Sequence, residues 1–145
     1  MSENKIVTDK RLFYKLNMAQ RLVLKYVDRE TTNHLGVSVT QASALFYLIK
    51  NDGCRLNDLS TFLMQNKSAI TTLVERMEKN DLIVRKKSKT DGRASNLFLT
   101  DKGRKLGRKA LPKVKELNQE LIKEFSDIEI EIINRFLDRI ITNYR

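Results

Sequence analysis

The side chains with the clearest chemical potential in this chain are cations that gather in its middle. Residues 53–109 carry 14 basic and 6 acidic residues, whereas 1–52 and 110–145 have net charges of only +3 and −1. A concentrated positive charge attracts polyanions through long-range electrostatics and through release of the counterions condensed on them. The charge distribution therefore predicts binding to a nucleic acid or to an anionic membrane surface.

The densest basic run lies between residues 85 and 93. We expect it to line a β-hairpin, with Arg93 at the tip. A guanidinium at such a tip can enter a narrow minor groove of DNA, where the negative potential is enhanced. The alternative is a freely solvated basic loop. The candidate DNA-binding residues of this hairpin are Arg85, Lys87, Lys89, Asp91 and Arg93, with Lys86 as a further cation.

A second polar surface is expected on a helix that follows Gln65. Apolar residues at helical spacing, from Ala69 to Met77, leave the opposite face polar. A lysine there can reach a guanine edge or a phosphate, an asparagine can pair with adenine, and hydroxyl groups suit phosphate and thymine contacts. The alternative is an ordinary solvated face. The candidate residues are Asn66, Lys67, Ser68, Thr71, Thr72 and Arg76.

Other kinds of site lack the residues that they require. Cys54 is the only cysteine and His34 the only histidine, so neither an intrachain disulfide nor a zinc cage is expected. The chain has no glycine-rich phosphate loop and no nucleophile elbow, which argues against an enzyme and against a cofactor. Arg55 could lower the pKa of Cys54 and make it reactive, although an unreactive, half-buried thiol is the favoured interpretation.

Neither a membrane span nor a signal peptide is expected. The sequence contains no run of 18 apolar residues, and its first residues lack the apolar stretch of a signal peptide. These observations predict a soluble, cytoplasmic protein without a membrane partner, so nucleic acid becomes the favoured polyanion.

Helical periodicity dominates the first half of the chain. Apolar residues at spacings of one, three and four predict a helix over 12–26, followed by a polar gap over 31–36. We expect Thr40 to cap a second helix that ends in the turn 51–53. Asn57 is expected to cap a short third helix, and the polar helix described above is the fourth.

The second half begins with a different pattern. Residues 82–84 and 96–100 predict a two-stranded hairpin, and two short helices followed by such a hairpin form a winged helix-turn-helix. Thr100 and Asp101 can then cap a long helix, which Pro112 either kinks or begins. A last apolar helix is expected to start at Ser126 or Asp127.

At this point the sequence resembles the multiple antibiotic resistance regulator (MarR) family over nearly its whole length. The resemblance rests on Val39-Thr40-Gln41 to Leu48, Leu56-Asn57-Asp58-Leu59, Ser68 to Met77 followed by Leu82-Ile83, and Asp91-Gly92-Arg93-Ala94 followed by Leu99-Thr100-Asp101-Lys102-Gly103. It implies a mainly α fold in a single domain over 1–145. The winged lobe would span about 38–101, and helices at about 8–30 and 102–145 would form a dimerisation region.

The resemblance also implies roles for individual residues. In the family the wing arginine enters the minor groove, so Asp91 and Arg93 carry this motif here. A carboxylate repels phosphate, and we therefore predict that Asp91 pairs with Arg76 and holds the wing against the fourth helix.

A homodimer follows both from the resemblance and from apolar chain ends that exceed the needs of a small winged helix. The seam candidates are Leu12, Phe13, Leu16, Phe136, Ile140 and Ile141. The alternative is a closed monomer core. A two-fold dimer predicts a pseudo-palindromic operator whose half-sites lie about one helical turn apart.

The expected function is sequence-specific binding to double-stranded DNA as a transcription regulator, with repression as the expected outcome. The resemblance implies relief by a small phenolic or aromatic acid, and Tyr14, Met18, Arg21, His34 and Tyr47 are candidates for its pocket. The alternative is a winged-helix module that binds protein or RNA. The DNA hypothesis requires that Lys67, Arg85, Lys87 and Arg93 form one continuous face.

Overall fold

The computed structural model describes residues 11–90 and 92–145. Its internal contacts divide the chain into two units, Met1–Ala110 and Leu111–Arg145. The single domain over 1–145 stays a prediction. The first unit holds α1 (Leu12–Leu35), α2 (Val39–Lys50), β1 (Cys54–Arg55), α3 (Leu56–Leu63), α4 (Lys67–Lys79), β2 (Ile83–Lys87) and β3 (Ser95–Leu99). Helix α5 (Asp101–Ile122) begins in this unit and ends in the second, which also contains α6 (Asp127–Tyr144).

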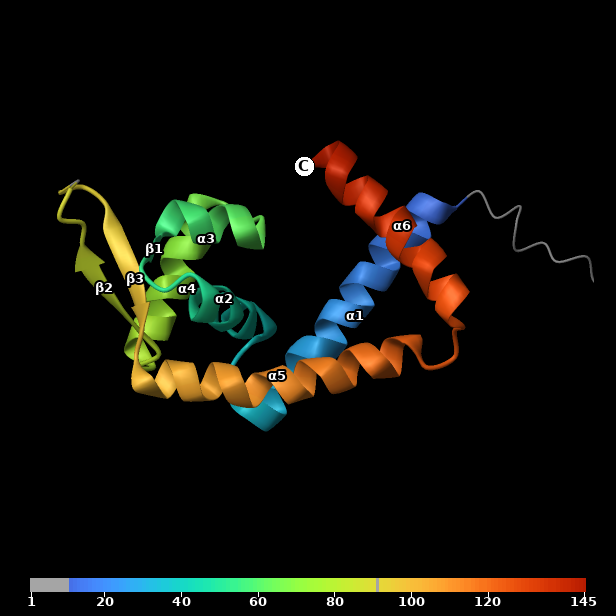
Figure 1. Ribbon diagram of the computed structural model, residues 1–145, viewed down its shortest axis with the longest axis horizontal. Helices are drawn as coiled ribbons and strands as arrows, with labels where there is room; N and C mark the ends of the chain where they lie inside the picture. The colour runs from blue at the N-terminus through green and yellow to red at the C-terminus, as the bar shows by residue number, and fades with distance from the viewer. Residues whose placement is uncertain (1–10, 91) are drawn as a thin grey trace, which may run out of the picture. The chain divides into compact units, whose positions relative to one another are not determined.

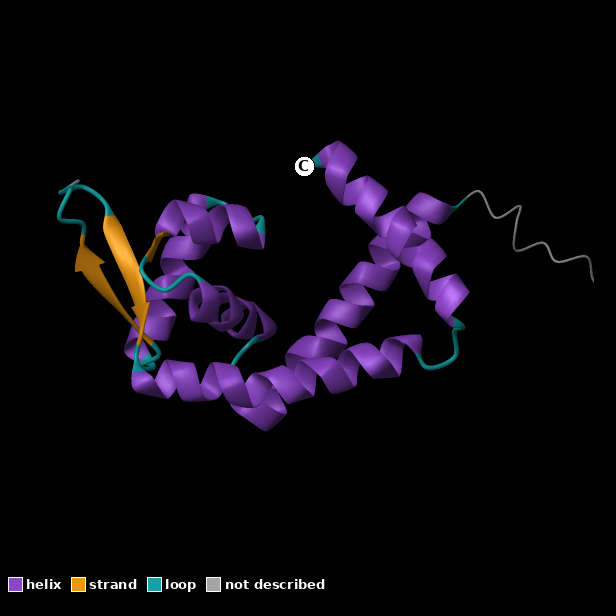
Figure 2. Cartoon of the chain, viewed as in Figure 1, coloured by secondary structure: helices purple, strands orange, loops and turns teal. Residues whose placement is uncertain are grey.

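The predicted order of a helix-turn-helix followed by a hairpin is confirmed (Figures 1 and 2). Helices α3 and α4 form the helix-turn-helix, and β2 and β3 form the wing. The sheet differs from the prediction because it has three strands, in the antiparallel order β1-β3-β2. Strand β1 was missed because its two residues, Cys54 and Arg55, carry no alternating pattern of their own and are defined only by pairing with Leu97 and Asn96.

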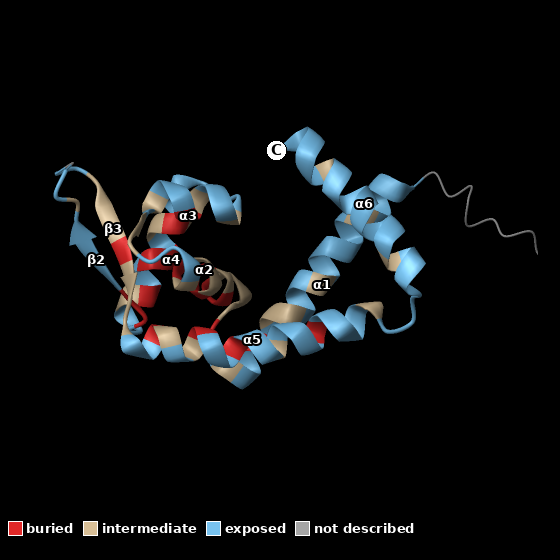
Figure 3. Ribbon diagram, in the orientation of Figure 1, coloured by how far each residue is buried: buried red, intermediate tan, exposed pale blue. Residues whose placement is uncertain are grey.

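The core of the first unit lies between α2, α3, α4 and the sheet. Leu45 and Leu48 of α2, Leu59 of α3, Val74 of α4 and Leu97 of β3 are fully buried. Figure 3 shows that buried residues gather in these elements and at the start of α5, whereas α6 is exposed along most of its length. The core thus fixes α4 against the sheet through one apolar face and leaves its polar face outside.

The first helix is longer than predicted, because residues 31–35 continue it instead of forming a gap. The Thr31 hydroxyl is buried and donates to the Asp28 carbonyl at 3.1 Å, so this polar residue is satisfied within the helix. The helix ends at Gly36, which has the left-handed φ of 71° and donates its N–H to the Thr32 carbonyl. Glycine adopts this conformation without steric cost, which makes it a common helix end.

Two predicted helix starts shift by two residues toward the N-terminus. Ser38, not Thr40, caps α2 and accepts from the Gln41 N–H at 3.1 Å, while Asp28 of α1 accepts from the Val39 N–H at 2.9 Å. Helix α3 starts at Leu56, before Asn57, and the Asp58 carboxylate accepts the Arg55 N–H at 3.0 Å. Both starts depend on acceptors that local sequence patterns did not single out.

The wing leads directly into α5. Thr100 caps this helix as predicted, since its hydroxyl accepts the Gly103 N–H at 3.0 Å. A β-carbon at Gly103 would collide with the Leu82 carbonyl, so glycine permits the helix to lie against the backbone at the start of the wing. Helix α5 includes Pro112, so the alternative in which the helix begins there is wrong.

In the second unit, Ser126 caps α6 as predicted. Its hydroxyl accepts the Glu129 N–H, and the Glu129 carboxylate in turn accepts the Ser126 N–H at 3.1 Å. These hydrogen bonds lower the pKa of Glu129. This capping box defines the start of the helix.

Candidate nucleic-acid interface

The exposed start of α4 is built by a local cap. The Asn66 side-chain oxygen accepts the Ala69 N–H at 2.8 Å, which leaves the amide nitrogen as the group available for other contacts. Lys67 follows as the first helical residue and is exposed. The hydroxyl groups of Thr71 and Thr72 donate to the carbonyls of Lys67 and Ser68 at 2.9 and 3.2 Å. Their oxygens can therefore still accept a hydrogen bond, and their methyl groups can still make apolar contacts.

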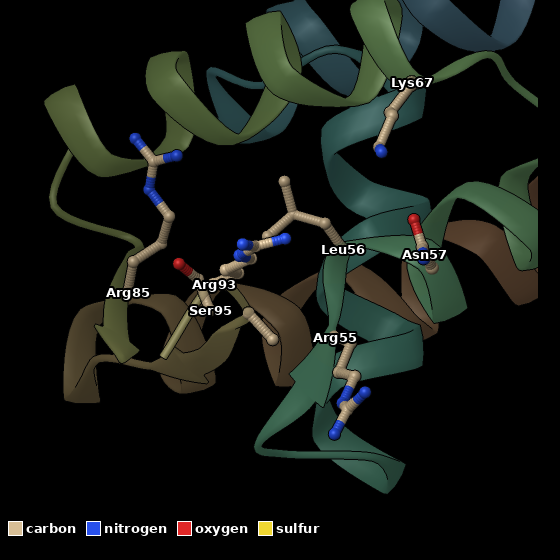
Figure 4. A pocket seen from close by; sticks show the side chains of 8 residues that line it. Arg55, Leu56, Asn57, Lys67, Arg85, Arg93 and Ser95 are labelled. Carbon is tan, nitrogen blue, oxygen red and sulfur yellow. The ribbon is translucent and has the colours of Figure 1, made fainter. Parts of the chain in front are cut away.

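Lys67 shares one pocket with two cations of the wing. The pocket has a volume of about 310 Å³, and Lys67, Arg85 and Arg93 line it together with Arg55 and Asn57 (Figure 4). Leu56, Ala94 and Ser95 complete the lining. Three of the four cations that were required to form one face thus converge on one concave surface between α3, α4 and the wing.

Strand register explains which wing residues face this pocket. Arg85 pairs with Leu97 and Lys87 with Ser95, so these side chains project from the face of the sheet that carries the buried Leu97. Lys86 projects from the opposite face, where its ammonium lies 4.9 Å from the centre of the Phe98 ring. Lys87 is exposed on the same strand face as Arg85 but lies outside the lining of the pocket.

An ion pair joins the wing to α4. The Arg85 guanidinium lies 2.7 Å from the Glu78 carboxylate, and each side chain is about one third exposed (34% and 31%). In Figure 4 the Arg85 side chain extends toward α4. The predicted pair between Asp91 and Arg76 was meant to make this connection, but Asp91 lies outside the described residues. Glu78 was missed because only the fold brings it beside Arg85.

A second pocket, of about 540 Å³, lies on another side of α4. Ser68, Thr72 and Arg76 recur every four residues and therefore lie on one stripe of the helix. They line this pocket with Asn66 and with residues from the start of α2, among them Gln41. The side-chain oxygen of Gln41 is buried, and within the part of the chain that the structure describes it has no hydrogen-bond partner. Of the candidate residues at α4, Lys67 thus lines the first pocket, whereas Thr71 lines neither; Asn66, Ser68, Thr72 and Arg76 line the second.

Two residues at the start of α3 were missed by sequence reasoning. Arg55 and Asn57 line the pocket of Lys67 and Arg93 because β1 pairs with β3 and places the start of α3 next to the wing. The basic side chain of Arg55 was a visible signal, but its position depends on the strand that was not predicted. The tip of the wing is closed by the Ser88 N–H, which donates to the Ala94 carbonyl at 2.9 Å, and Lys89 and Arg93 are exposed there.

Cys54 lies in β1 and is half-buried. Burial raises the pKa of its thiol to about 11, and the carboxylates of Asp58 and Asp52 contribute in the same direction. The hypothesis that Arg55 lowers this pKa is therefore wrong, since burial and the acidic neighbours outweigh one adjacent cation. The thiol is protonated at neutral pH and is a poor nucleophile.

The candidate effector residues do not meet in either pocket described above. His34 lies 3.2 Å from the Glu30 carboxylate within α1, and the Tyr47 ring stacks on Phe62 with 4.6 Å between the ring centres. Tyr14 and Met18 are exposed on α1, as is Arg21. An effector role for these five residues stays a prediction.

The candidate dimer residues are largely exposed to solvent in the single chain. Leu12, Phe13, Phe136 and Ile141 are exposed, with Phe13 at 85%, and Leu16 and Ile140 are partly exposed. Helix α6 has no buried residue, although it carries a full apolar stripe. Water-exposed apolar stripes of this size are typical of surfaces that meet a partner.

The described residues offer neither a metal site nor a membrane span. Within residues 11–90 and 92–145, no group of three or more histidine, cysteine, aspartate or glutamate side chains is placed to hold a metal ion. Over the same residues, no helix is both long enough and apolar enough to cross a membrane.

A winged helix with cations on the polar face of α4 and on the wing defines a DNA-binding class of protein, and known proteins match it. The model of the MarR family matches residues 35–94. The transcriptional regulator MhqR of Bacillus subtilis is 26% identical over 130 residues, which cover 90% of this chain and 89% of MhqR. BilQ of Clostridioides difficile is 34% identical over 85 residues, or 59% of this chain and 57% of BilQ.

A solved structure has the same fold. The structure of S. aureus MepR in a complex with DNA superposes with a TM-score of 0.83 at 24% identity, covering 90% of this chain and 96% of MepR. These matches support a transcriptional regulator of the MarR family, and the chain has the winged-helix fold of the solved structure.

Proposed function

We propose that this protein is a homodimeric transcription regulator that recognises a pseudo-palindromic operator in double-stranded DNA. In this proposal α4 enters the major groove, with its exposed first turn near the base edges, and Arg93 enters the adjacent minor groove. The observation that carries the proposal is the convergence of Lys67, Arg85 and Arg93 on one pocket. A phosphate group of the DNA backbone fits between the two groove-reading elements at this position.

In a dimer, the second copy of the chain supplies the α4 helix that reads the second half-site of the DNA. The exposed apolar residues of α1 and α6 support an interface between two copies of the chain. Because a two-fold axis relates the copies, the two α4 helices would read half-sites about one helical turn apart. A bound dimer covers a promoter and excludes polymerase, so repression is the expected outcome. Relief of repression by a small aromatic acid remains part of the proposal.

The proposal is tested by selecting bound fragments from a random pool of duplex DNA and sequencing them. We expect enrichment of an inverted repeat with half-sites one helical turn apart, and loss of enrichment when Lys67→Ala and Arg93→Ala are combined. The competing function, an RNA- or protein-binding winged helix, predicts no enriched duplex motif. A pool of structured RNA tested in parallel distinguishes the two, because double-stranded RNA hides its major-groove edges from a helix.

A further inference from the structure

A row of cations covers the outward side of α5, in the part of this helix that belongs to the first unit. Residues 102–109 contain five basic and no acidic side chains. Arg104 is paired, because its guanidinium lies 3.1 Å from the Asp52 carboxylate. The other four are exposed, and at about 100° per residue they lie within roughly one third of the helix circumference. We call these four residues the α5 arc: Lys102, Lys105, Arg108 and Lys109.

The positive charges of the α5 arc have no acidic partner. Among the described residues none of the four side chains forms an ion pair with a carboxylate. Lys105 is three or four residues away from each of the other three, and like charges at these helical spacings repel each other. An anionic partner relieves this repulsion, so the arc is suited to a surface that carries many negative charges.

The α5 arc is remote from both elements of the proposed DNA interface. Lys67 and Asn80 stand at opposite ends of α4, roughly 20 Å apart at 1.5 Å per residue. Lys102 belongs to the far end, because its ammonium donates to the Asn80 carbonyl at 2.9 Å. Arg93 lies at the tip of the wing, whereas α5 begins at the base of the wing (Figure 1). The arc is therefore a second cationic surface and not an extension of the pocket of Lys67 and Arg93.

The surroundings of the arc indicate which kind of anionic partner it fits. Its three lysines also rim a groove of about 480 Å³, whose floor includes Val37 and Leu82. These two core side chains are only 6% and 1% exposed, so a large partner meets the ammonium groups first. Between residues 102 and 109, the outward side of the helix presents the four cations and no apolar side chain.

This composition argues against two other classes of partner. A helix that lies on a membrane needs large apolar side chains beside its cations. The centre of a protein interface is usually aromatic or apolar and is depleted of lysine. A phosphodiester backbone, in contrast, is bound by cations alone, without apolar contacts.

We propose that the α5 arc binds the phosphate backbone of duplex DNA at a second site, separate from the interface on α4 and the wing. A duplex carries one charge per about 1.7 Å of its axis, so the roughly 10 Å of helix between Lys102 and Lys109 lies along several phosphates. Binding by the arc stands on its charge and position alone. Its consequence, that one protein holds an operator and a second DNA segment together, rests on the proposed function.

The test uses the full chain with Lys67→Ala and Arg93→Ala combined, which disables the interface on α4 and the wing. Its result therefore does not depend on the proposed function. Fluorescence anisotropy over a salt series measures the remaining affinity for a short duplex of arbitrary sequence, and we expect salt-dependent binding to persist. Adding Lys105→Gln, Arg108→Gln and Lys109→Gln should weaken this binding by about 10- to 100-fold, or two- to fivefold for each ion pair lost. The salt slope should become less negative by about 2.7.

The matched control combines Arg21→Gln, Lys25→Gln and Arg135→Gln in the same background. It removes three exposed cations from α1 and α6 and therefore has the same net charge as the arc variant. Because salt screens charges that lie far from the bound DNA, the control should weaken binding by less than about threefold. Circular dichroism establishes that each variant is folded.

Lysine acetylation followed by mass spectrometry locates the contact. In the Lys67→Ala, Arg93→Ala background, duplex DNA should protect Lys105 and Lys109 from acetylation and leave Lys25 reactive. The proposal is overturned if no duplex binds in this background, if the arc variant binds as the control does, if the two lysines are not protected, or if poly-glutamate binds as tightly as the duplex. An operator motif enriched by the unaltered protein alongside any of these results would refute the second site and leave the proposed function intact.

Discussion

The Arg85 guanidinium and the Glu78 carboxylate meet at 2.7 Å and connect the wing to α4. The pair has two consequences for DNA binding. It holds β2 beside α4, and it neutralises part of the charge that Arg85 brings to the pocket that it lines with Lys67 and Arg93. Exposed ion pairs contribute little energy, so we expect the main value of this pair to be positional.

Replacing Glu78 tests this connection. Glu78→Gln should lower the free energy of unfolding by no more than about 1 kcal/mol, because both partners are about one third exposed. A double-mutant cycle with Arg85→Gln, measured by urea denaturation, should give a coupling energy of about 0.2–1 kcal/mol. Glu75→Gln, on an exposed position of the same helix, is the control. A coupling energy of zero would mean that the pair does not hold the wing.

Replacing Arg93 and replacing Lys67 are expected to weaken DNA binding in different ways. Arg93→Ala should cost about 1–3 kcal/mol of specific DNA binding, the scale of a lost groove contact. If Lys67 neutralises one phosphate, Lys67→Ala should reduce the steepness of the salt dependence. The slope of the logarithm of the association constant against the logarithm of the salt concentration should become less negative by about 1. Fluorescence anisotropy over a salt series measures both effects, with Lys50→Ala at the end of α2 as a control. A DNA affinity that changed neither with salt concentration nor in the Arg93→Ala variant would contradict the proposed binding mode.

Cys54 should react slowly and with a steep dependence on pH. Its folded-state pKa of about 11 lies above the ordinary thiol value, so the thiolate is depleted at pH 8 relative to a free cysteine. The rate of alkylation by iodoacetamide should rise about tenfold per pH unit and level off only near pH 11, whereas the urea-unfolded chain should level off near pH 8.5. Equal rates in the folded and unfolded protein at pH 7 would show that the thiol is not suppressed.

Phe136 provides a direct test of the dimer. Its side chain is 38% exposed in the single chain and lies on the apolar stripe of α6. A charge buried in an apolar interface is strongly unfavourable, so Phe136→Glu should convert a dimer into a monomer in light scattering after gel filtration. Asn134→Glu, an exposed polar position on the same helix, should leave the dimer intact. A monomeric unaltered protein would refute the homodimer, although not the fold.

The parts of the fold that depend on near neighbours in the chain were predictable. The caps Thr100 and Ser126 each hydrogen bond to a residue three positions ahead, and the apolar stripe from Ile70 to Met77 is buried as expected. The start of α2 was not predictable in this way, because Ser38 and Thr40 both have hydroxyl groups. The contact that distinguishes them comes from Asp28, which lies on another helix.

The same distinction applies to the candidate site. Lys67 and Arg93 were found from residue type and spacing, and the fold brings them together. Arg55 and Glu78 were missed because their neighbours in space are set by strand pairing. Arg55 reaches the site because β1 pairs with β3. Glu78 contacts Arg85, whose position on β2 is set by the pairing of β2 with β3. Residues that act through pairing between distant segments have no periodic signal in the sequence.

The alternation of side chains along β2 limits how this wing can change in length. Arg85 projects toward α4, and Lys86 projects from the other face toward Phe98. Inserting or deleting one residue within β2 would exchange the two faces, and deletion of Val84, for example, would place Lys86 where Arg85 meets Glu78. Length variation among functional versions of this protein should therefore be confined to the tip over residues 88–94, where an added residue lengthens the reach of the wing and leaves its two faces unchanged.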